Sequence, residues 1–166
     1  MTPRRPVYLA GFDVFRRDAL ARGQYLQALC ADQGLEGLSL FDNDLSAGLE
    51  GAAARYICTL NIEMIRRSDA VLANLNVFRG QEPDAGTAFE VGLAVALGKP
   101  VWAYFDLDRS LRQQVSHDVQ GYDAQGGAVE DFNLPRNLML ATSWAGYRAT
   151  VEQAVGDLRR HLTSAP

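Results

Sequence analysis

Short apolar runs alternate along this chain with longer segments whose apolar residues recur at helical spacing, and this alternation constrains the fold more than any other feature. The pattern predicts strands at residues 6–11, 38–41, 70–75 and 100–105, and helices at 17–33, 52–67, 85–98 and 148–162. The third run is almost wholly apolar, as expected of a strand that is buried on both faces. Repeated strand–helix alternation predicts a parallel sheet covered by helices on both faces.

The expected fold class is therefore α/β, a doubly wound parallel sheet of the flavodoxin-like or Rossmann-like kind. The length of 166 residues suits a single domain over residues 1–166. In such sheets ligands bind beyond the carboxyl ends of the strands, where the strand order reverses. The segments expected to meet there are residues 11–18, residues 74–90 and the chain after Phe105.

The charge balance argues against some partners. A net charge of −4 and a pI near 5.1 disfavour nucleic acid, because binding a phosphate backbone requires a basic patch. The apolar run at residues 7–12 is too short for a membrane span or a signal segment, so a cytoplasmic protein is expected. Cys30 and Cys58 lack metal or redox spacing and are expected to be buried free thiols.

Several kinds of chemistry lack their usual motifs. His117 and His161 have no metal-ligand spacing, so no metal site is expected. The sequence contains no Walker A loop and no Gly-x-Ser-x-Gly elbow. A receiver-like phosphoacceptor would need an aspartate at the end of the third strand, where Asn74 and Asn76 stand instead.

Glu90 is the most unusual residue, because everything else from Ala85 to Gly98 is small, apolar or Thr87. Burying a carboxylate without a partner is costly. The four residues from Thr87 to Glu90 match a capping box, and taken alone they favour this structural interpretation. A capping role is compatible with a chemical role for Glu90, since the positive end of a helix dipole favours an ionised carboxylate. An ionised carboxylate at a ligand crevice suits a nucleophile that attacks a sugar carbon.

The neighbours of Glu90 also admit two interpretations. Asp84 is either a turn or N-cap residue or a carboxylate that faces the crevice, and Gly86 permits close approach of a ligand. Tyr8 in the first strand is more often a core residue than a catalytic one. Asp69, before the third strand, is usually a cap or turn residue.

The chain resembles the nucleoside 2-deoxyribosyltransferases in its longest motif, Phe-Arg-Gly-x-Glu-Pro-Asp-x-Gly-Thr-Ala-Phe-Glu-x-Gly, at residues 78–92. The similarity extends to residues 7–11, 68–71 and 130–140, so it spans nearly the whole chain in the expected order. Members of this family move a 2-deoxyribosyl group from one nucleobase to another without a cofactor or a metal. The resemblance thus implies deoxynucleosides and free nucleobases as partners, and a role in nucleoside salvage.

The resemblance implies roles for four residues. Glu90 matches the nucleophile that forms a covalent deoxyribosyl-enzyme, and two displacements at one carbon retain its configuration. Asp69 and Asp84 match the acid and base that serve the nucleobase. Tyr8 matches the residue that orients the nucleophile.

The resemblance also implies a shared site and a set of substrate contacts. Asn137 and Met139 match an Asn-x-Met pair that a neighbouring subunit supplies, its asparagine contacting the sugar 5′-hydroxyl, so a homo-oligomer is expected. The other residues expected to bind substrate are Gly11, Phe12, Asp13, Phe15, Arg79, Gly80 and Gly86.

Two departures from the family pattern stand near the expected crevice. Relatives commonly have Gly-Pro after the first strand, whereas this chain has Gly11, Phe12 and Asp13. Many relatives end the third strand with Ala-Asp-Leu, whereas this chain has Asn74 in place of the aspartate. We expect Asp13 to affect which base is accepted, and Asn74 to remove one negative charge.

Two other functions fit the same sequence. An N-glycoside hydrolase would cleave a deoxynucleoside or its 5′-monophosphate with water, although residues 12–15 are poorly suited to bind an anion. A doubly wound module that senses a nucleotide without turnover is the non-enzymatic alternative, because the fold alone carries no function.

Overall fold

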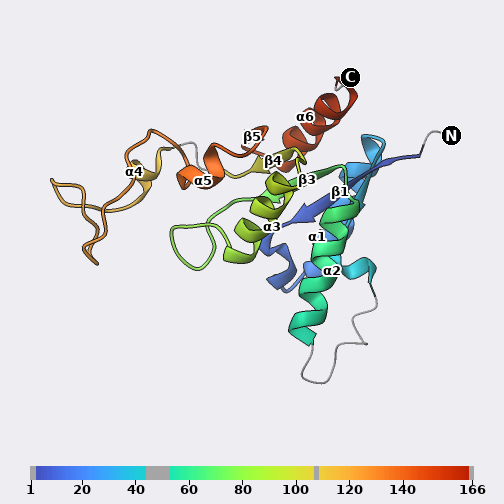
Figure 1. The fold of residues 1–166 in the computed structure, drawn as a ribbon, viewed down its shortest axis with the longest axis horizontal. Coiled ribbons are helices and arrows are strands. Elements are labelled where there is room, and N and C mark those ends of the chain that lie inside the picture. The colour runs from blue at the N-terminus through green and yellow to red at the C-terminus, as the bar shows by residue number, and fades with distance from the viewer. Residues whose placement is uncertain (1–2, 44–52, 107–108, 165–166) are drawn as a thin grey trace.

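The computed structural model describes residues 3–43, 53–106 and 109–164. Its centre is a parallel sheet of five strands in the order β2-β1-β3-β4-β5 (Figure 1). The strands are β1 Arg5–Ala10, β2 Leu35–Leu38, β3 Ala70–Asn74, β4 Val101–Tyr104 and β5 Gly146–Arg148. The predicted α/β doubly wound fold is confirmed.

Helices cover both faces of this sheet. The α-helices are α1 Ala19–Asp32, α2 Ala53–Arg67, α3 Ala85–Ala96, α4 Leu111–Gln114, α5 Leu138–Ala141 and α6 Val151–Ser164. Two short 3-10 helices are η1 Phe12–Phe15 and η2 Leu40–Asp42. One core cluster contains buried residues of α2 and α3, and a second contains buried residues of α1 and α6. The sheet therefore separates α2 and α3 from α1 and α6.

The strand order reverses between β1 and β3. The chain passes from β1 to β2 on one side of β1 and then returns to place β3 on the other side. Ala10 pairs with Ala73, so the carboxyl ends of β1 and β3 lie next to each other. The segments that come directly after these two strands are η1 and the loop of residues 75–84, and they therefore border the expected ligand crevice.

The pleat of β1 selects the face on which Tyr8 lies. Successive side chains of a strand point to opposite faces. Val7 packs in the cluster with α1 and α6, whereas Tyr8 packs in the cluster with α2 and α3. Tyr8 is thereby directed toward the helix that carries Glu90.

Three details differ from the sequence prediction. The second strand was expected at 38–41 but ends at Leu38, because Ser39 and Asp42 form a capping box that starts η2. The fifth strand, β5, was not predicted. Cys30 is buried as expected, but Cys58 is exposed, so the prediction for Cys58 was wrong.

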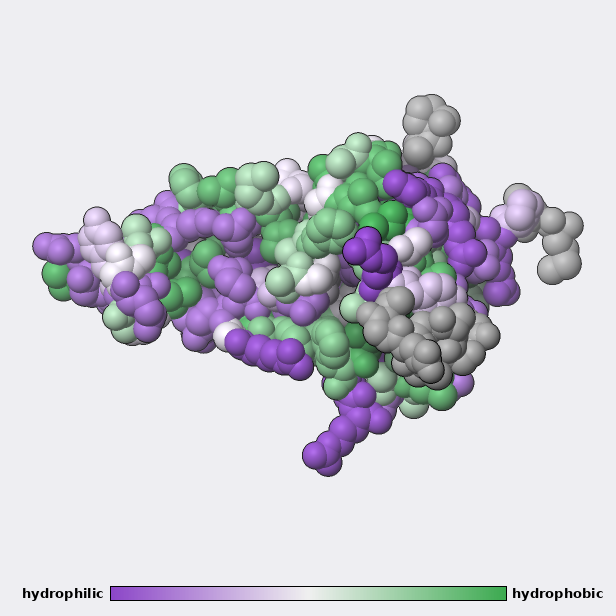
Figure 2. All heavy atoms as spheres, turned by 60° about the horizontal axis from the view of Figure 1, so that its bottom comes forward, coloured by the Kyte–Doolittle hydropathy of each residue, from purple (hydrophilic) through white to green (hydrophobic). Residues whose placement is uncertain are grey.

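The segment around α4 projects away from the sheet as an arm, which Figures 1 and 2 both show at the left. Within this arm, Arg112 of α4 donates hydrogen bonds from Nη1 to the carbonyl oxygens of Gly121 and Val129, which connects α4 to the following loop. Within the described parts of the chain, every helix is too short or too polar to cross a membrane.

Candidate active site

Glu90 lies in α3, and side chains from two other elements bind its carboxylate. The Tyr8 hydroxyl of β1 donates a hydrogen bond of 2.6 Å to Oε1, and Asn61 Nδ2 of α2 donates one of 3.1 Å to the same oxygen. Burial raises the pKa of Glu90 to about 7. The two hydrogen bonds act in the opposite direction, while the charge of Asp84 adds to the rise. The site therefore holds a carboxylate that titrates near neutral pH.

The capping box predicted for Thr87 and Glu90 is wrong. The helix begins at Ala85, and Asp84 is its N-cap: Oδ2 accepts hydrogen bonds from Thr87 N at 2.9 Å and from Thr87 Oγ1 at 3.1 Å. Thr87 is thus a buried residue of the first turn. Because Asp84 already satisfies the backbone N–H of Thr87, the side chain of Glu90 is left to bind Tyr8 and Asn61.

Tyr8 makes the contact with Glu90 that the resemblance implied. Its side chain is almost fully buried within the core cluster that α2 and α3 cover. Burial, together with the charge and hydrogen bond of Glu90, raises the pKa of Tyr8 well above its ordinary value. The hydroxyl is therefore protonated at neutral pH and available as a donor.

Asn61 is a site residue that the sequence analysis missed. It is spaced four residues from both Ile57 and Ile65 on α2, so it falls on the apolar stripe of this helix. Together with Glu90 and Gly86 it lines an apolar groove of about 340 Å³ between α2 and α3. A single amide on an apolar helix face was the signal that could have identified it.

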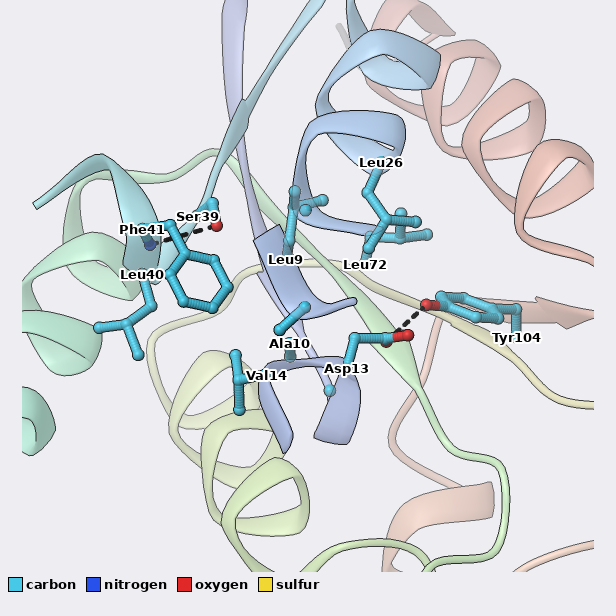
Figure 3. Close-up of a pocket in the computed structure, with 13 residues that line it drawn as sticks. Leu9, Ala10, Asp13, Val14, Leu26, Ser39, Leu40, Phe41, Leu72 and Tyr104 are labelled. Atoms are coloured by element: carbon cyan, nitrogen blue, oxygen red, sulfur yellow. Dashed lines mark hydrogen bonds between the residues drawn. The ribbon is translucent and has the colours of Figure 1, made fainter. Parts of the chain in front are cut away.

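Asp13 lies in a buried polar network. Its Oδ1 accepts a hydrogen bond from Arg22 Nε at 3.1 Å, and its Oδ2 accepts bonds from Asn74 Nδ2 at 2.7 Å and from the Tyr104 hydroxyl at 3.3 Å. Figure 3 shows the side chains of Asp13 and Tyr104 directed toward each other. A Cβ on Gly11 would lie 2.7 Å from Asn74 Cβ and 2.9 Å from Asp13 Oδ2, so glycine fits this close approach.

This network leaves little room for a ligand at Asp13. The cavity that Figure 3 shows beside Asp13 has a volume of about 20 Å³, which admits a water molecule but no nucleobase. Both carboxylate oxygens of Asp13 already accept hydrogen bonds from protein groups. The structure therefore places Asp13 among hydrogen-bonding protein groups, and its influence on the accepted base stays a prediction.

An aromatic cluster, defined as Phe12, Phe15 and Phe78, joins η1 to the loop after β3. The ring centroid of Phe78 lies 4.8 Å from that of Phe12 and 5.5 Å from that of Phe15, both in stacked orientation. The guanidinium of Arg79 lies 4.6 Å from the Phe78 ring centroid. Arg79 and Gly80 both have positive φ, 54° and 155°. Four predicted substrate-binding residues, Phe12, Phe15, Arg79 and Gly80, therefore lie next to Phe78. Phe78 itself was not among the predicted site residues.

Asp69 does not join the site. It lies at the amino end of β3, where its backbone N–H bonds to Pro6 O and its Oδ2 accepts from Arg5 Nε at 2.8 Å. The active-site segments lie beyond the carboxyl ends of the strands, at the opposite edge of the sheet. The structure therefore does not bring Asp69 together with Glu90, and the acid–base role expected for Asp69 gains no support from its position.

Asn137 and Met139 lie on another flank of α3. Asn137 caps α5 and donates from Nδ2 to Glu130 Oε1, and 70% of Met139 is exposed. Both residues line a groove of about 620 Å³ that includes Val91 and Val95 of α3. Glu90 lines the separate groove against α2. Within one chain the predicted Asn-x-Met pair therefore does not meet Glu90.

Comparison with known proteins identifies the family and the fold of the chain. Residues 7–139 match the family described as nucleoside 2-deoxyribosyltransferase. The structure of a 2-desoxiribosyltransferase from Leishmania mexicana matches with a TM-score of 0.79 and 35% identity, over 95% of this chain and 98% of the other. A 2-deoxyribosyltransferase from Bacillus psychrosaccharolyticus shares the fold, with a TM-score of 0.61, 20% identity and 90% of each chain covered.

A curated relative also matches the chain. This uncharacterized protein of Schizosaccharomyces pombe is 35% identical over 127 residues, which are 68% of this chain. The match spans 59% of the length of that relative. The family match covers most of the chain, and the Leishmania structure covers nearly all of it. The chain belongs to the nucleoside 2-deoxyribosyltransferase family.

Proposed function

We propose that this protein transfers a 2-deoxyribosyl group between nucleobases, with Glu90 as the nucleophile of a double displacement. The observation that carries the proposal is the arrangement of donors around Glu90. Tyr8 and Asn61 both donate to Oε1, and in the described part of the chain no group donates to Oε2. A carboxylate with one oxygen fixed and the other open suits covalent catalysis.

The two displacements balance in bonds and protons. Glu90 Oε2 forms a bond to the anomeric carbon while the bond from that carbon to the base nitrogen breaks, and the leaving nitrogen keeps the electron pair and takes up a proton. A nitrogen of the incoming base then attacks the same carbon, the carbon–oxygen bond breaks, and the carboxylate returns. The incoming nitrogen loses its proton. Two inversions retain the configuration of the sugar.

Asp84 is the carboxylate to which we assign both proton transfers. Its charge contributes to the raised pKa of Glu90, so the two carboxylates are close enough to interact. Thr87 bonds to Oδ2 of Asp84 and thereby fixes its orientation. A carboxyl group that protonates the leaving base is then in the right form to deprotonate the incoming base.

The aromatic cluster gives the nucleobase a surface to stack on. Phe15 is 58% exposed, and the cluster stands beside the carboxyl ends of β1 and β3. Stacking of a base on an aromatic ring tolerates different bases, because every base has a π face. This surface supports a reaction in which one base replaces another.

A second copy of the chain completes the site in this proposal. Asn137 and Met139 line a groove on the flank of α3 away from Glu90 of their own chain, and we assign them to the site of a neighbour. Exposed apolar side chains on α3, Phe89 and Val95, offer surface for such a contact. Figure 2 likewise shows hydrophobic areas exposed between hydrophilic ones.

The test is incubation with deoxyinosine, with and without free adenine, and subsequent chromatography of the products. A transferase forms deoxyadenosine, and only when adenine is present. Release of deoxyribose at equal rates in both samples would identify a hydrolase and contradict the proposal. No turnover in either sample would favour a sensing module over both enzymes.

A further inference from the structure

We propose that Asn61 is a positioning residue, which holds Glu90 so that Oε2 rather than Oε1 faces the sugar. This inference rests on the proposed role of Glu90 as the nucleophile. Asn61 itself does not contact the reacting atoms; it acts through the carboxylate.

The first support is the convergence of two donors on one oxygen. The Tyr8 hydroxyl reaches Oε1 from the sheet, and Asn61 Nδ2 reaches it from α2. A single hydrogen bond would leave the carboxylate free to rotate, whereas two donors from different elements fix its plane. Because both donors use Oε1, the lone pairs of Oε2 are left for the anomeric carbon.

The second support is that the amide is poorly suited to the fold itself. Asn61 Oδ1 is buried and has no hydrogen-bond partner within the described residues. The amide stands between Ile57 and Ile65 on its helix, and Ile62 and Phe89 line the same groove. An unpaired buried acceptor costs free energy that an apolar side chain would not. The bond to Glu90 is therefore the favourable contact that accounts for the amide.

The third support is electrostatic. Among the described residues, the titratable side chains around Glu90 are Tyr8 of β1, Asp84 before α3 and Cys58, which lines the same groove from α2. Burial and the charge of Asp84 both favour the protonated form of Glu90, whereas the neutral Asn61 donor favours the ionised form that attacks carbon. Loss of this donor should thus reduce the ionised fraction near neutral pH.

The experiment compares Asn61→Leu with the wild type in base exchange from pH 5 to 9 and in urea unfolding. Leucine matches the shape of asparagine closely but donates no hydrogen bond. We expect exchange at pH 6 to fall about tenfold or more, the size of a lost hydrogen bond to a charged group. The acidic limb of the profile should move up by about one pH unit. Stability should be unchanged or higher.

The matched control is Thr59→Ala, which removes a polar side chain from the exposed side of the same helix. Its rate and profile should equal those of the wild type. If Asn61→Leu fails to fold, Asn61→Ala takes its place. An unshifted profile, or a loss of stability that accounts for the loss of exchange, would overturn the inference.

A second measurement separates this inference from the proposed function. The Glu90 carboxyl carbon is monitored by NMR through a pH titration, which requires no turnover. A higher pKa of Glu90 in Asn61→Leu supports the inference, and an equal pKa overturns it, whatever the wild type catalyses. Absence of exchange by the wild type would instead overturn the proposed function, while the titration would still show whether Asn61 stabilises the ionised carboxylate.

Discussion

Asn74 donates a hydrogen bond of 2.7 Å from Nδ2 to Oδ2 of Asp13, so the two departures of this chain from its family's pattern are in direct contact. Asp13 in η1 thus sets a carboxylate directly beside the asparagine that ends β3. Arg22 neutralises this carboxylate through Oδ1. The two departures therefore contact each other, and the carboxylate at this edge of the sheet is part of an ion pair.

Swapping the side chains of positions 13 and 74 should show whether Asp13 and Asn74 are energetically coupled. Asp13→Asn removes the ion pair with Arg22, and Asn74→Asp sets two carboxylates against each other, so each single variant should lose about 1–3 kcal/mol of unfolding free energy. The double variant restores one carboxylate and one amide and should recover part of that loss. Urea unfolding of the four proteins measures the cycle. Losses that simply add would show that the pair is uncoupled.

Glu90→Gln should change how stability depends on pH. Because the folded protein raises the pKa of Glu90 from 4.5 to about 7, it favours the protonated form. The stability of the wild type relative to Glu90→Gln should therefore fall as pH rises from 4.5 to about 7, and stay constant above that. The change should amount to about 3 kcal/mol at most. Unfolding at a series of pH values measures it, and a difference independent of pH would contradict the burial of this carboxylate.

Tyr8→Phe should slow base exchange while leaving the sheet intact. The ring stays in the core, but Glu90 loses the shorter of its two hydrogen bonds. We expect a rate reduction of about tenfold to a hundredfold at neutral pH, because hydrogen bonds to charged groups contribute about 1.5–3 kcal/mol. Steady-state rates measure it. Tyr25→Phe, which removes a hydroxyl that bonds Glu152 in the layer of α1 and α6, is the control and should keep wild-type exchange.

The sequence was sufficient to predict the strands that are buried on both faces. β1, β3 and β4 form continuous apolar runs, and their predicted bounds agree with the structure to within one residue at most points. β5 could not be found in this way. It has three residues, one a glycine and one an arginine, and it is a strand only because it pairs with β4.

The candidate site was predictable where a residue was out of place in its own segment. Glu90 was recognisable as a charge in an apolar helix. Asn61 was missed because the apolar stripe of α2 predicts a core-facing helix side, and one amide on that side does not change this prediction. The capping box failed because Asp84 and Glu90 compete for the backbone N–H of Thr87, and local sequence does not decide between them. Asp69 was assigned by resemblance, although a residue that starts a strand lies at the edge opposite to the crevice.

Mixing two inactive variants should test whether subunits share sites. We expect Glu90→Ala to abolish base exchange. We expect Asn137→Ala to weaken base exchange strongly, because the sugar loses the asparagine that the neighbouring chain supplies. In a mixed dimer, one site combines Glu90 of one chain with Asn137 of the other. Equal mixing with subunit exchange should therefore restore about a quarter of wild-type activity, since half the dimers are mixed and each has one intact site.

The matched control for this complementation is a mixture of Glu90→Ala with Tyr8→Phe. Tyr8 and Glu90 act within one chain, so no mixed dimer gains a site in which both residues are intact. Activity should stay at or below the average of the two proteins measured separately. If the mixture of Glu90→Ala with Asn137→Ala behaves in the same way, Asn137 does not serve the site of a neighbouring chain.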